Sequence, residues 1–67
     1  MRDAVKSDMA HALEYDAATG TITVHFHSGG SHAFGPFTQQ EYEAFRAADS
    51  IGRHFHAHIR AKAIKNG

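Results

Sequence analysis

Histidine is the residue type that most invites a chemical function, because seven of the 67 residues are histidines. His54 and His58 lie four residues apart in a stretch with helical periodicity, and His25 and His27 lie two apart in a stretch with strand periodicity. Both spacings place two imidazoles on one face, where they can bind one metal ion. Each pair supplies only two ligands, and the strand pair is expected on the sheet face away from the helices. The sequence therefore predicts no native metal site and no cofactor.

The same histidines are possible general bases, with Ser28, Ser31 or Ser50 as nucleophiles. None of these serines lies in a recognisable catalytic motif, and Ser50 is better explained as a helix cap. A chain of 67 residues also has little room for a closed pocket that excludes water. We therefore expect a protein that is not an enzyme and has no catalytic residues.

Positive charge gathers at the end of the chain. Residues 1–49 contain seven acidic and three basic residues, for a formal charge of −4, whereas residues 50–67 contain four basic residues and no acidic one, for +4. The side chains predicted along the outward side of a second helix, or at its margin, are Arg53, His56, Arg60 and Lys62. Lys65 adds a further positive charge beyond Lys62 in the sequence. Because an acid-free basic surface attracts anionic partners, we predict that these residues form the binding surface.

A small α+β domain is predicted to position these side chains. Residues 1–6 are polar and lack periodicity, which indicates a flexible N-terminus. Alternating apolar residues over 9–15, 21–27 and 31–35 predict three antiparallel strands in a meander. The residues expected to share one face of the first strand are Met9, His11, Leu13 and Tyr15. Those expected to face the core from the second strand are Ile22, Val24 and Phe26.

Two helices are predicted after the sheet, both packed on one of its faces. Thr38 and Glu41 have the spacing of a capping box, which starts a helix that ends near Asp49. Asp49 or Ser50 then caps a second helix, on which His58 is expected partly buried. Its apolar face carries Ile51, Phe55 and Ile59.

The predicted order of elements is therefore β-β-β-α-α. The domain should span residues 7–61, and residues 62–67 should form a basic tail that extends or frays the last helix. Gly52 weakens the first turn of the second helix by about 1 kcal/mol relative to alanine. We therefore expect a neighbouring backbone or a ligand to approach closely at Gly52.

The run Ala47-Ala48-Asp49-Ser50-x-Gly52-Arg53-x-Phe55, with Ile22-x-Val24-x-Phe26 and Ser28-Gly29-Gly30, resembles the KTSC domain. This family is named for its place at the C-terminus of some lysyl-tRNA synthetases, and the resemblance covers about residues 7–60. The family also occurs as free-standing small proteins of bacteria and phages, which this chain resembles more than a synthetase appendage. The chain departs from the family where a Tyr-x-Tyr pattern falls on His32-Ala33-Phe34 and where His54 replaces a tyrosine.

Two functions of different classes remain open. The resemblance implies binding of RNA or another nucleic acid, because of the synthetases that the domain accompanies. The alternative is a protein-interaction module, such as a phage-encoded protein that binds and modulates a host protein. With no cysteine, no targeting segment and no apolar run of about 20 residues, we expect a cytoplasmic location and no membrane partner. The sequence predicts no oligomeric state.

Overall fold

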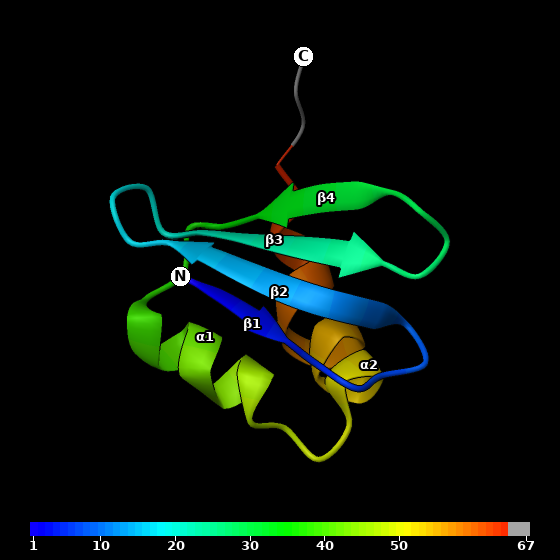
Figure 1. The fold of residues 1–67 in the computed structure, drawn as a ribbon. Helices are drawn as coiled ribbons and strands as arrows, with labels where there is room; N and C mark the ends of the chain where they lie inside the picture. The colour runs from blue at the N-terminus through cyan, green and yellow to red at the C-terminus, as the bar shows by residue number, and fades with distance from the viewer. Residues whose placement is uncertain (65–67) are drawn as a thin grey trace.

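The computed structural model describes residues 1–64, and its centre is an antiparallel sheet with the strand order β1-β2-β3-β4 (Figure 1). The strands are β1 (Arg2–Ala4), β2 (Ala10–Asp16), β3 (Thr21–Phe26) and β4 (Ser31–Phe34). The α+β class is confirmed, but the predicted number of three strands is wrong. The additional strand is β1, which lies within the segment expected to be a flexible N-terminus and pairs with residues 12–14 of β2.

Tertiary contacts rather than an apolar pattern hold β1 at the sheet edge. The Tyr42 hydroxyl donates a hydrogen bond of 2.6 Å to Oδ2 of Asp3, and Arg46 Nε lies 3.7 Å from the same oxygen. The Tyr15 amide donates a hydrogen bond of 2.8 Å to the Met1 carbonyl. Since these partners are distant in sequence, the residues of β1 show no local sign of their pairing.

A β-bulge at the start of β2 changes which side chains face the core. The pairing of β2 with β3 shifts between Ala10 and Ala12. Ala10 and Leu13 are fully buried, whereas His11 is exposed. A one-residue insertion reverses the faces on one side of a bulge. The prediction that His11 shares the buried face with Leu13 is therefore wrong.

The α1 helix (Gln39–Arg46) begins as the sequence predicts. The Glu41 amide donates to Thr38 Oγ1 at 3.1 Å, and the Thr38 amide donates to Glu41 Oε1 at 2.8 Å, which completes the capping box. Tyr42 and Phe45 are fully buried under the sheet. The Tyr15 hydroxyl donates to the Phe37 carbonyl at 2.8 Å and so joins the sheet to the residue before the cap.

The second helical segment covers the same face of the sheet but is not one regular α-helix (Figure 1). It starts as α2 (Ile51–His54), widens into a π-helical turn, η1 (Phe55–Ile59), and tightens into a 3₁₀ turn, η2 (Arg60–Lys62). The residues that it buries are the predicted ones, Ile51, Phe55 and Ile59. Phe55 meets Phe26 and Phe34 edge to face, with ring centroids 5.9 and 5.1 Å apart. Its predicted burial against β3 is confirmed.

The chain after η2 returns to the sheet instead of extending the helix. Ala63 forms an isolated antiparallel bridge with Phe34, and the Ile64 amide donates to the Ala33 carbonyl at 3.0 Å. The Gly35 amide donates to the Lys62 carbonyl at 2.9 Å. Residues 62–64 therefore cover part of the β4 edge. The rest of the predicted tail, with Lys65, lies outside the described residues.

Candidate nucleic-acid interface

The outward side of the second helical segment carries three of the four predicted binding residues. Arg53, on α2, and His56 and Arg60, farther along the segment, are all exposed. The Ser50 side chain caps α2 by accepting a hydrogen bond of 3.2 Å from the Arg53 amide, which leaves the guanidinium at the surface. No ion pair formed within residues 1–64 involves Arg53 or Arg60. Their charges are therefore available to an anionic partner.

Lys62, the fourth predicted residue, is held against the start of α1. Its Nζ donates a hydrogen bond of 3.1 Å to the Pro36 carbonyl and lies 4.8 Å from the centre of the Phe37 ring. A cation over an aromatic face is stabilised by the ring quadrupole. Lys62 thus marks the margin of the basic surface and is less free than Arg53 or Arg60 to reach a ligand.

The histidine buried in the helical segment is His54, not His58. His54 is half-buried and stacks on Phe45, with ring centroids 5.4 Å apart, whereas His58 is exposed. Partial burial lowers the pKa of His54, and nearby His58 lowers it further. The prediction of a partly buried His58 is therefore wrong.

The other histidine pair lies on the opposite face of the sheet, as predicted. His25 Nε2 donates to Glu14 Oε1 at 2.7 Å, so its Nδ1 accepts the 2.7 Å hydrogen bond from the Ser31 hydroxyl. His27 Nε2 donates to the Ser7 carbonyl at 2.7 Å. These hydrogen bonds occupy three of the four ring nitrogens of the pair. Within residues 1–64, no group of three histidine or acidic side chains is placed to hold one metal ion.

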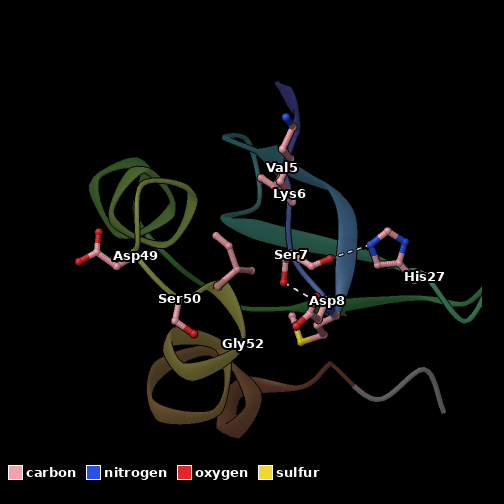
Figure 2. A pocket seen from close by; sticks show the side chains of 10 residues that line it. Val5, Lys6, Ser7, Asp8, His27, Asp49, Ser50 and Gly52 are labelled. Carbon is pink, nitrogen blue, oxygen red and sulfur yellow. Dashed lines mark hydrogen bonds between the residues drawn. The ribbon is translucent and has the colours of Figure 1, made fainter.

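An open groove lies between the β1–β2 loop and the junction of the two helical segments. Its volume is about 670 Å³. Figure 2 shows Ser7 and Asp8 on one side of it and Ser50 and Gly52 on the other, with His27 beyond Ser7. Lys6 and Asp49 also line it. Sequence analysis missed the groove because residues 1–6 were expected to lie outside the domain.

Gly52 was the one sequence signal that pointed to this place, although for a different reason. A Cβ built on Gly52 would meet no atom within 4 Å. The expected close approach of a neighbouring backbone is therefore wrong. Gly52 instead forms part of the groove wall, where a larger side chain would project into open space.

The phenylalanine and tyrosine side chains do not form a surface on which bases could stack. Six of the seven phenylalanine and tyrosine rings are buried, and Phe26 is partly buried and packed against the core. Any contact with nucleic acid would therefore rest on charge, hydrogen bonds and exposed imidazoles such as that of His56, rather than on stacking against phenylalanine or tyrosine. Within residues 1–64, no helix is long and apolar enough to cross a membrane.

Comparisons with known proteins agree with the resemblance seen in the sequence. The family model of the KTSC domain matches residues 6–62. A crystal structure of a KTSC domain protein from Yersinia pestis is 25% identical, with a TM-score of 0.86 over 100% of this chain and 97% of that chain. A search of curated proteins finds no match. The family match covers most of the chain, and the chain therefore belongs to the KTSC domain family.

Proposed function

We propose that this domain is a non-enzymatic binding module that contacts the phosphates of RNA through Arg53, His56, Arg60 and Lys62. The observation that carries the proposal is the exposure of Arg53 and Arg60 in a segment without acidic residues, where no described ion pair neutralises them. The association of the family with lysyl-tRNA synthetases supports RNA as the partner. The cytoplasm is the location proposed for this activity.

The chemistry of the surface indicates weak and sequence-independent binding. Cations bind phosphates by releasing counterions, so the affinity depends on the number of contacts and on salt. Arg53, Arg60 and Lys62 can each contact one phosphate of single-stranded RNA. With these three phosphate contacts, the affinity for RNA should fall about 20-fold between about 50 mM and about 200 mM salt. The surface exposes no phenylalanine or tyrosine ring, so it has no large aromatic platform on which to stack bases.

The test is fluorescence anisotropy with a labelled, unstructured RNA oligonucleotide. The variant Arg53→Glu/Arg60→Glu should lose about 10-fold or more of the affinity, because both changes place repulsive charge against phosphate. The charge-matched control is Lys6→Glu/Gln39→Glu/Gln40→Glu, which lowers the net charge by the same amount at exposed side chains outside the second segment. Equal losses in the two variants, or no binding by the parent at low salt, would reject the proposed surface.

A second function, binding of a protein partner, is favoured by the groove. Its walls combine apolar Val5 and Met9 with the charged side chains of Lys6, Asp8 and Asp49, so a protein partner would meet both apolar and charged groups there. Gly52→Phe should place a ring in the groove and obstruct it, since a Cβ at this position meets no atom within 4 Å. A defined protein that is retained from nuclease-treated host lysate, lost with Gly52→Phe and kept with Arg53→Glu/Arg60→Glu would support this alternative.

A further inference from the structure

A second cavity lies between α1 and the second helical segment. It has a volume of about 190 Å³ and is lined by Phe37, Glu41, Ala44, His54, His58 and Ile59. His54 and His58 thus project from the second segment toward a pocket whose far wall is α1. Their ring centroids are 4.7 Å apart, with an angle of 52° between the planes.

This separation matches two imidazoles bound to one ion in adjacent positions. A coordinating imidazole nitrogen lies about 2.0–2.1 Å from a transition metal, which places the ring centroid about 3.2 Å from it. Two centroids 4.7 Å apart then subtend about 95° at the ion. Such an angle suits neighbouring positions in the tetragonal geometry of Cu²⁺ or Ni²⁺.

We infer that His54 and His58 form a two-imidazole site for a divalent transition metal, with water completing the coordination. Cu²⁺ is the ion expected to bind most tightly, because affinity for nitrogen ligands rises along the first-row series to copper. Within residues 1–64 no third side chain joins them in a group able to hold the ion, so the affinity should be modest. The inference is independent of the proposed binding of RNA.

The surroundings of the pair suit a metal more than those of the other histidine pair. His54 is held in place by stacking on Phe45, with the ring centroids 5.4 Å apart, so one of the two imidazoles is already positioned. The Glu41 carboxylate also lines the pocket, and its negative charge attracts a cation. Lys62, near Glu41, opposes this attraction. By contrast, His25 uses both ring nitrogens in hydrogen bonds to Glu14 and Ser31.

The test is titration of the untagged protein with Cu²⁺, followed by calorimetry and by electron paramagnetic resonance. One ion should bind per chain, and its spectrum should show nitrogen ligands. His54→Gln and His58→Gln should each weaken binding by about 10-fold or more. The double variant His25→Gln/His27→Gln, which also removes two imidazoles, should bind within about twofold of the parent, as should His56→Gln.

Equal weakening by the sheet variant and the helix variants would mean adventitious binding to scattered histidines, and would overturn the inference. Unchanged affinity in His58→Gln would also overturn it. Because His58 is exposed, this variant should keep the melting temperature of the parent and so decides the question even if His54→Gln disturbs the fold.

Discussion

The two helical segments cover the same face of one sheet, yet they are built in different ways. In α1, a complete capping box and a regular stripe of buried residues favour the same helix. In the second segment, the backbone changes from α to π to 3₁₀ within 12 residues, although Ser50 caps its start. A helix is regular where local signals and tertiary packing agree. Where they differ, the packing decides the geometry.

The spacing of the buried residues explains the change of geometry in the second segment. Ile51, Phe55 and Ile59 repeat every four residues, and this repeat drifts around a helix that has 3.6 residues per turn. The wider π turn, in which the Arg60 amide donates to the Phe55 carbonyl, reduces that drift and keeps Ile59 in the core. Single π turns inside helices are frequent at functional sites. Here the turn lies between Arg53 and Arg60 and carries His58.

The largest expected effect tests whether packing controls the second segment. Phe55→Ala should lower the free energy of unfolding by about 3–5 kcal/mol, because it removes a ring that contacts Phe26 and Phe34 and leaves a cavity. Phe45→Ala, the matched change in α1, should cost a similar amount. Urea denaturation measures both. A Phe55→Ala protein with nearly the parent stability would show that Phe55 does not hold the segment in place.

Sequence reasoning succeeded where a local pattern carries the structure. Thr38 and Glu41 are three residues apart and cap α1 without help from the rest of the chain. Asp3 contacts Tyr42 and Arg46, and the separation of 39 residues between Asp3 and Tyr42 means that β1 shows no local sign of this pairing. The bulge at His11 is likewise an outcome of strand pairing.

The same distinction applies to the candidate site. The exposure of Arg53, His56 and Arg60 followed from helical periodicity. The anchoring of Lys62 by Pro36 and Phe37 depends on how the end of the segment meets the start of α1. The burial of His54 depends in the same way on its contact with Phe45. The spacing of residues within one element does not predict the contacts that it makes with another element.

Two glycines should respond oppositely to the same substitution. Gly20 has a φ of +73°, and a Cβ there would lie 2.7 Å from the Phe37 carbonyl oxygen, just before the α1 cap. Gly20→Ala should therefore lower the free energy of unfolding by about 2 kcal/mol or more. Gly52→Ala meets no atom and lies in a helix, so it should raise that free energy by about 0.5–1 kcal/mol. Thermal melts of the two variants decide this, and changes of the same sign would contradict it.

Removal of the two helix caps should change the free energy of unfolding by amounts that differ less than those of the two glycine substitutions. Thr38→Ala removes the acceptor of the Glu41 amide and breaks the reciprocal box, which should cost about 1–2 kcal/mol. Ser50→Ala removes a single 3.2 Å hydrogen bond from the Arg53 amide, and it should cost about 0.5–1 kcal/mol. Chemical denaturation of both variants gives the two values. A larger loss from Ser50→Ala would show that the second segment depends more on its cap than on its packing.

The smallest expected effect is the contribution of His54, in the second segment, to the pH dependence of stability. Burial lowers the folded-state pKa of His54 below its ordinary value of 6.5, so acid favours the unfolded chain, which binds the proton more readily. Stability should therefore be complete above about pH 6.5, fall as the pH drops toward the folded-state pKa, and level off below it. His54→Gln removes this contribution, and its melting temperature should fall less than that of the parent between about pH 7 and about pH 5. His56→Gln, which removes an exposed imidazole from the same segment, should follow the parent curve. If His54→Gln follows it as well, burial against Phe45 does not affect the titration of His54, and α1 and the second segment are not linked through this ring.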